Sequence, residues 1–246
     1  MIGWIHADWD APDHVLAGTT TREGGISEAG YASLNLGAHV DDEPASVAGN
    51  RARLRHDLEL NAEPCWLEQV HGNEVTRFDQ SPAGAPVSDA SVTAEPGVPL
   101  VIMTADCLPV LLVNRSGTEI AAVHGGWRSL AAGILARSVA AMASAPDTLV
   151  AWLGPAISSP NFEVGAEVRE AFVSHDPDLS GCFRPNARGR YQADLYGIAG
   201  RQLRNLGVRQ ISGGGWCTFA ESERFYSHRR DPRCGRMASL LMLRHR

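Results

Sequence analysis

The chain lacks any long apolar run and any leader-like start. The longest apolar stretch lies around residues 100–113 and is interrupted by Thr104, Asp106 and Pro109. It is therefore too short and too polar to cross a bilayer. The N-terminal segment MIGWIHADWDAP has neither the basic region nor the apolar core of a secretory signal. We expect a cytoplasmic protein with no membrane partner.

Excess positive charge is also lacking. The formal net charge is -6, and the basic residues are arginines that lie mostly in the second half. Proteins that bind nucleic acids neutralise the phosphate backbone with clustered Lys and Arg. The composition therefore argues against a nucleic-acid partner, whereas 44% apolar and 20% charged residues are ordinary for a soluble globular protein.

Cysteines are few, and their number is odd. The five are Cys65, Cys107, Cys182, Cys217 and Cys234. An odd set without a secretory leader speaks against a disulfide framework. In a reducing compartment a cysteine is a metal ligand, a nucleophile or, most often, a small apolar core residue. Each cysteine therefore needs its own argument.

No linker, low-complexity tract or internal repeat divides the 246 residues, so we expect one domain spanning residues 1–246. Apolar runs rich in Val, Ile and Leu predict strands, at residues 15–19, 65–71, 100–104, 109–113, 119–124, 149–153 and 208–212. Residues 100–113 and the strand after Gly117 have the pattern of a meander.

Helical spacing of apolar residues predicts helices at residues 44–58, 127–142, 165–174 and 194–206. Asp194 is the expected N-cap of the last helix, and Gly207 lies just past its end. Strands and helices alternate, but neighbouring strands also look like hairpins. The pattern favours an α+β fold, a single domain of mixed β-sheets flanked by helices.

Three residues with metal-binding side chains each lie at the end of an apolar strand. They are His71 in QVHG, Cys107 in TADCLP and His124 in VHGGWR. Two imidazoles and a thiolate provide three of the four ligands of tetrahedral zinc and leave one position for water or substrate. On spacing alone, the alternative of a buried cysteine and two unrelated histidines stays open.

Several residues near these motifs are candidates for substrate binding. Gly125 and Gly126 precede a predicted helix, where backbone N–H groups approach anions; a simple tight turn is the alternative. Arg51 lies beside the apolar stripe of its helix, and either extends to water or binds an anion. The arginines next to glycine-rich or aromatic turns are further phosphate candidates: Arg22, Arg128, Arg229 and Arg236. Asp106 is a candidate proton carrier or an outer neighbour of the metal.

Together these motifs resemble the YfiH-like, or laccase-domain, family. The resemblance covers nearly the whole chain in order, in segments 21–25, 33–37, 50–51, 69–72, 104–109, 122–128, 153–157, 162–165 and 225–231. It implies mixed sheets flanked by helices and zinc on His71, Cys107 and His124. One departure is Asp41-Asp42, where the family has Gly-Asp.

The resemblance also implies an activity. Members of the family are described as purine nucleoside phosphorylases, with adenosine deaminase and methylthioadenosine phosphorylase activities in the same site. Arg51 and Asn35 match positions near that pocket. The expected substrates are purine nucleosides and phosphate, with Gly125, Gly126 and Arg128 as further phosphate contacts. The zinc-deaminase signature H-x-E with P-C-x-x-C is absent, so deamination would use a different geometry.

Three other functions remain alternatives. A copper polyphenol oxidase is disfavoured, because the chain has nine histidines and no His-x-His; copper in the zinc site in vitro would explain weak oxidation. A hydrolase that edits peptidoglycan precursors would use Cys107 as nucleophile with a histidine base. A non-catalytic module would close the zinc site with a fourth ligand, for which Cys217 and His228 are candidates.

Overall fold

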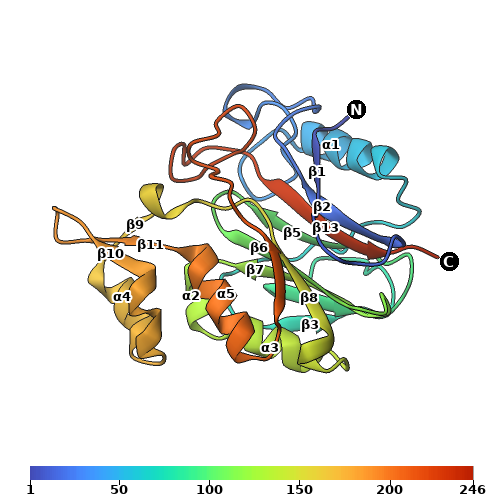
Figure 1. The fold of residues 1–246 in the computed structure, drawn as a ribbon. Helices are drawn as coiled ribbons and strands as arrows, with labels where there is room; N and C mark the ends of the chain where they lie inside the picture. Colours follow the sequence, from blue (N-terminus) through green and yellow to red (C-terminus); the bar gives the residue numbers. More distant parts are fainter. Residues whose placement is uncertain (246) are drawn as a thin grey trace.

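Two β-sheets packed face to face form the centre of the molecule, which a computed structural model describes for residues 1–245 (Figure 1). The smaller sheet has the strand order β1-β2-β13-β5, and the larger has the order β12-β8-β6-β7-β4-β3. The strands are β1 Trp4–His6, β2 Val15–Thr20, β3 Val75–Arg77, β4 Ala90–Thr93, β5 Leu100–Thr104, β6 Leu108–Asn114, β7 Ile120–Gly125, β8 Leu149–Leu153, β12 Gln210–Gly213 and β13 Met237–Leu243. Parallel and antiparallel pairs both occur, which confirms the predicted α+β class with mixed sheets.

Helices cover the outer faces of both sheets. In Figure 1, α1 (Pro44–Asp57) lies over the smaller sheet, and the other helices lie below the larger one. These are α2 Trp127–Ala131, α3 Ile134–Ala141, α4 Ala166–Val173 and α5 Leu195–Asn205. A small sheet, β10-β11-β9, and four 3-10 turns complete the fold: β9 Glu163–Val164, β10 Phe183–Pro185, β11 Tyr191–Ala193, η1 Ala29–Tyr31, η2 Pro146–Thr148, η3 Ser159–Asn161 and η4 Pro177–Cys182. Among the described residues, no helix has both the length and the apolarity to span a membrane.

The alternation of side chains along β6 explains this layering. Leu111 and Val113 are fully buried against the smaller sheet, in a core shared with Ile102. Val110 and Leu112 point to the opposite face and pack with α3, α4 and α5. Successive residues of a strand face opposite sides, so a strand apolar at every position must be buried on both faces. β6 is such a central strand.

Two predictions about strands are wrong. Residues 100–113 are not part of one meander, because β5 pairs within the smaller sheet and β6 within the larger; the chain changes sheets at residues 105–107. Residues 65–71 are not a strand and form only isolated bridges, Cys65 with Leu100 and Glu68 with Val87. Their backbone instead curves around a buried side chain described below.

The predicted helix 127–142 is divided. Its two parts are α2 and α3, and Gly133 between them has φ +80°, a conformation in which glycine has no steric penalty. The other three predicted helices are present within two residues of their expected bounds. The Asp194 cap is confirmed, since its carboxylate accepts a hydrogen bond from the Gly197 N–H at 3.0 Å.

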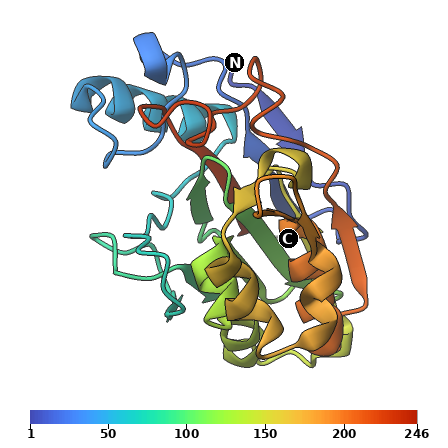
Figure 2. The same ribbon diagram turned by 90° about the vertical axis from the view of Figure 1, so that its left-hand side faces the viewer.

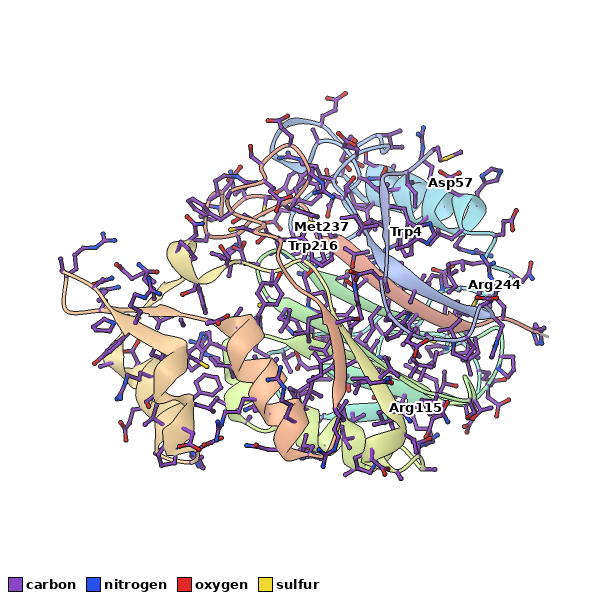
Figure 3. All side chains as sticks on the ribbon, in the orientation of Figure 1. Trp4, Asp57, Arg115, Trp216, Met237 and Arg244 are labelled. Atoms are coloured by element: carbon purple, nitrogen blue, oxygen red, sulfur yellow. The ribbon has the colours of Figure 1, made fainter. Side chains whose placement is uncertain are left out.

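The long segment before β13 returns to the N-terminal loops. Figures 1 and 2 both show this red segment beside the blue loops that precede α1. The Arg22 N–H donates to the Arg224 carbonyl at 2.9 Å. Trp216 and Met237, labelled in Figure 3, belong to an apolar cluster with Ala105 and Tyr226. The cluster holds the 105–107 crossover against the C-terminal segment.

Candidate metal centre

Three side chains from separate segments meet at the crossover between the sheets. His71 lies in the loop after the irregular 65–70 segment, Cys107 in the turn between β5 and β6, and His124 near the end of β7, where it pairs with Pro109 of β6. Their ligand atoms all lie within 4.8 Å of one another. The Cys107 Sγ is 3.8 Å from the His71 Nε2, close to the ~3.6 Å that zinc–sulfur and zinc–nitrogen bonds at a tetrahedral angle produce.

Asp89, which precedes β4, orients both histidines. Its fully buried carboxylate accepts a hydrogen bond from His124 Nδ1 at 2.7 Å, which leaves Nε2 to face the other two ligands. The same carboxylate accepts the N–H groups of Val70, His71 and Gly72 at 3.2, 2.9 and 2.6 Å. It thereby holds His71 at φ +61°, a backbone conformation that non-glycine residues rarely adopt. A carboxylate behind a histidine ligand is the usual support of a metal site.

Gly126 provides room for the ligands. A Cβ at this position would lie 2.8 Å from His71 Cδ2 and 3.3 Å from Cys107 Sγ. Any side chain here would displace an imidazole or the sulfur. Gly126 therefore has a steric role at the three side chains, and the role of the Gly125–Gly126 pair in binding an anion stays a prediction.

The electrostatics favour a thiolate. Burial raises the pKa of the Cys107 thiol, but the charge of His124 and hydrogen bonds from both histidines outweigh it, so the pKa is lowered. Burial lowers the pKa of His124, but the Cys107 sulfur and Asp89 more than compensate and raise it. A thiolate between two imidazoles, with a carboxylate behind one of them, is a donor set that suits zinc.

A pocket of about 170 Å³ opens beside His71 and Cys107. Its wall includes Cys107, Trp127, Arg128, Phe162, His228 and Arg229. The Arg128 guanidinium is 4.3 Å from the Trp127 ring centre, and that of Arg229 is 5.3 Å from the Phe162 ring centre. The pocket thus combines flat apolar surfaces with two cations.

Asp106 lines the same pocket but makes structural contacts. Its carboxylate accepts the Thr218 hydroxyl and the Arg229 N–H, both at 2.7 Å, and its φ is +93°. These bonds join the 105–107 crossover to the C-terminal segment and fix Arg229 in the wall of the pocket. The predicted role of Asp106 as proton carrier stays a prediction, while its contacts are those of a positioning residue.

Asn35 and Arg51 lie on the α1 side. Asn35 is fully buried, and its Oδ1 accepts the N–H groups of Gly37 and Arg236, each at 2.9 Å. Its Nδ2 donates to Asp42 at 2.9 Å. The preceding Asp41 has φ +61°, which explains why a glycine is expected at that position. Asn35 therefore shapes the loop, and Arg51 extends across it to the Leu36 carbonyl.

The fourth-ligand candidates are not part of the centre. Among residues 1–245, the one group of His, Cys, Asp or Glu side chains close enough to share an ion is His71, Cys107 and His124. Cys217 instead accepts a hydrogen bond from Asn161 at 3.2 Å, and His228 lies in the pocket wall. Three potential ligands next to a pocket would leave the fourth coordination position of a metal free. This arrangement is typical of catalytic zinc sites, whereas structural zinc sites have four protein ligands.

The sequence interpretation missed Asp89 and the pocket residue Phe162, and it considered His228 as a fourth ligand and not as part of a pocket wall. Asp89 directly precedes the apolar strand β4, and an acidic residue entering a buried strand was the only signal. Phe162 had no signal beyond its place in a family motif. Which aromatic ring lines the pocket depends on how the loops around it pack, and the sequence does not show this packing.

Known proteins are similar to this one over nearly the whole chain. The family model described as multi-copper polyphenol oxidoreductase laccase matches residues 16–244. The chain is 51% identical to a purine nucleoside phosphorylase of Pseudomonas aeruginosa, over 99% of both proteins. It is 49% identical to the purine nucleoside phosphorylase YfiH of Escherichia coli K12, over 97% of this chain and 98% of that protein. The crystal structure of a Neisseria meningitidis protein is similar with a TM-score of 0.95 and 43% identity, over 99% of this chain and all of that one.

Proposed function

The chain belongs to the family described as multi-copper polyphenol oxidoreductase laccase, and we propose that it is a zinc-dependent purine nucleoside phosphorylase. The proposed substrates are adenosine, inosine and related nucleosides, including methylthioadenosine, with adenosine deaminase activity in the same site. The observation that carries the proposal is the open group of His71, Cys107 and His124 beside an aromatic pocket. The names of the relatives support it.

The donor set favours zinc over the copper in the family description. Blue copper needs a weak axial ligand such as Met, but the Met103 sulfur contacts the Arg51 guanidinium at 4.0 Å. A multicopper oxidase needs further clusters, and among the described residues there is one candidate group. Zinc in this group would supply a Lewis acid and an open coordination position. Copper in vitro remains compatible with the same ligands.

The protein's own residues hold and orient the substrates. Trp127 and Phe162 offer flat surfaces for a purine, and Arg128 with the Gly125–Gly126 turn contributes phosphate contacts, as does Arg51. The buried Asn35 contributes through the loop that its hydrogen bonds hold. Asp106 fixes the wall and is the proposed proton carrier. His71, Cys107 and His124 act as the catalytic ligands. A cytoplasmic location, where thiols stay reduced, suits the free Cys107.

The test is direct. Metal-replete protein is incubated with inosine or adenosine and phosphate, and the products are separated by chromatography. Base release or deamination is expected with wild type and is lost in Cys107→Ala. Cys182→Ala, which removes a partly exposed thiol near η4, is the matched control and should retain activity. Absence of both products at high enzyme concentration would refute the proposal.

A cysteine hydrolase is the second candidate. Cys107, His124 and Asp89 are arranged as nucleophile, base and orienting carboxylate, the pattern of a catalytic triad. Such an enzyme would hydrolyse an amide, as in editing of peptidoglycan precursors. A metal-bound thiolate is a poor nucleophile, so metal content discriminates. Zinc-free protein that hydrolyses amides and is alkylated at Cys107 would favour this function.

A further inference from the structure

A second, mainly apolar cleft lies among the helices on the outer face of the larger sheet (Figure 1). Its volume is about 230 Å³. Its walls include Leu135 and Ala136 of α3, Ala171 and Phe172 of α4, and Gln202 of α5. None of these five residues lines the 170 Å³ pocket at the metal centre, so the cleft is a separate cavity.

Small residues keep the cleft open. Gly133, between α2 and α3, lines it, and a Cβ at this position would have no atom within 4 Å. Ala136 and Ala171 are the next smallest side chains in the walls, whereas Leu135 and Phe172 are almost fully buried and supply apolar surface. Pockets for drug-sized molecules have volumes of about 300–1,000 Å³. The cleft therefore suits a smaller, flat molecule of one or two fused rings.

One buried acceptor at the cleft lacks a donor. Gln202 Oε1 is buried and accepts no hydrogen bond from any residue that the structure describes. The orientation of the amide is fixed, because Nε2 donates to the Leu130 carbonyl at 3.1 Å and a carbonyl can only accept. The terminal torsion of glutamine is soft, so a small rotation would present Oε1 to a molecule in the cleft. A ligand N–H or O–H would satisfy this acceptor, whose burial without a partner is unfavourable.

The charges around the cleft favour a neutral ligand. All its lining residues belong to the described part of the chain, and none of them is Lys or Arg, so an anion would find no counter-ion there. Asp176 lines the cleft, but its Oδ2 already accepts from Arg201 Nε at 3.0 Å and from Asn205 Nδ2 at 3.1 Å. Because Arg201 compensates this carboxylate, a cation would gain little.

We propose that the cleft binds a small neutral aromatic molecule with one N–H or O–H donor, of the indole or phenol class, whose donor bonds to Gln202 Oε1. The site does not depend on the proposed phosphorolysis, because His71, Cys107 and His124 do not line it. The helix α2 lies between the two cavities, since Trp127 lines the metal pocket and Ala131 lines the cleft.

The experiment compares the binding of indole and indene by isothermal titration calorimetry. Indene has the shape of indole but carries a CH₂ group in place of the N–H. Wild type should bind one indole per chain and should prefer indole about threefold to tenfold, the value of one neutral hydrogen bond. In Gln202→Met, which has a side chain of similar length without an acceptor, the two affinities should agree within about twofold. Equal affinities in wild type would overturn the assigned hydrogen bond.

A second set of variants tests the location. Ala136 is exposed and lines the cleft, so Ala136→Leu should fill the cleft and weaken the binding of both probes at least about tenfold. Ala140→Leu is the control, because Ala140 is exposed one turn later on α3 and does not line the cleft; it should bind indole as wild type does. If Ala136→Leu unfolds, Ala171→Leu fills the cleft from α4. Unchanged indole affinity in the folded variants would overturn the site.

Thermal unfolding checks that Gln202→Met remains folded without its bond to Leu130. If it unfolds, the preference of wild type for indole over indene and the loss of binding in Ala136→Leu decide the question. Two further results would overturn the proposal. Displacement of indole by inosine would place the probe in the metal pocket, and a change of self-association in ligand-free Ala136→Leu, measured by sedimentation, would show that a second copy of the chain covers the cleft.

Discussion

Asp89 is the residue on which the geometry of both imidazoles depends. One oxygen, Oδ1, accepts His124 Nδ1 and the His71 N–H, and the other accepts the Gly72 N–H. A single carboxylate therefore sets the ring orientation of one ligand and the backbone of another. Mutations of such outer residues typically reduce metal affinity while the ligands stay in place.

We predict that Asp89→Asn weakens zinc binding by about 10- to 100-fold. The amide side chain cannot accept from all four donors, so His124 and the 70–72 backbone lose support. A chromophoric chelator competing for zinc measures the change. Asp8→Asn is the control, because Asp8 also accepts a buried donor, the Trp152 indole at 2.8 Å. Equal zinc affinity in Asp89→Asn and wild type would contradict the orienting role.

Gly126 supports a second prediction at this scale. In Gly126→Ala the new methyl would lie 2.8 Å from His71 Cδ2, so His71 must move, and zinc content should fall well below one ion per chain. Gly181→Ala, at a position with open space around the Cβ, should keep its zinc. Elemental analysis of both purified proteins checks this. Full zinc occupancy in Gly126→Ala would show that His71 is not constrained from this side.

The meeting of His71, Cys107 and His124 could be predicted because metal-binding chemistry is carried by residue type. A histidine or cysteine at a strand end is visible in the sequence, and the family motifs place them in register. Asp89 could not be predicted in this way. In the sequence a buried aspartate looks the same as a surface one, and only the donors that bond to its carboxylate in the folded chain distinguish it. Asp106 was singled out as a neighbour of Cys107, but its φ of +93° turns the carboxylate towards Thr218 and Arg229.

At the scale of elements, periodicity located most helices and the inner strands. It could not show that β5 and β6 belong to different sheets, because a chain reversal within a sheet and a crossover between sheets have the same local pattern. Residues 65–71 are apolar enough for a strand, but the N–H groups of Val70 and His71, together with that of Gly72, donate to the Asp89 carboxylate instead of to a neighbouring strand. A tertiary hydrogen bond thus overrides strand propensity.

Glu119 links β7 to the end of α3 and should make stability depend on pH. Burial raises its pKa, but hydrogen bonds from Ala143, Ser144 and Arg77 outweigh it, so the pKa is below the ordinary value of 4.5. The group therefore stabilises the fold above about pH 4.5, and this contribution is lost as pH falls through the lowered folded pKa.

In Glu119→Gln, one amide donor of residues 143–144 loses its acceptor, which should cost about 1–3 kcal/mol at pH 7. The difference from wild type should shrink below about pH 4.5, as wild-type Glu119 becomes protonated. Urea unfolding at pH 7 and pH 3.5 measures both values. A difference that is equal at the two pH values would show that the charge of Glu119 contributes nothing.

At the scale of the whole molecule, the candidate metal centre lies where the chain passes from the smaller sheet to the larger one. Cys107 lies in the crossover from β5 to β6, His124 in β7, and His71 in a loop held by Asp89. A bound ion would cross-link these segments in the folded state only. At a free concentration of about 100 times its Kd, it would add about 2.7 kcal/mol of stability.

We therefore expect chelation to lower the Tm by about 5–11 °C, since 1 kcal/mol shifts the Tm of a chain this long by about 2–4 °C. Differential scanning calorimetry with and without chelator, followed by zinc addition, measures the loss and its recovery. His71→Ala should unfold at the Tm of chelated wild type and should not respond to zinc. If wild type also fails to respond, the three side chains do not share an ion, because any ion bound only by the folded state must raise the free energy of unfolding.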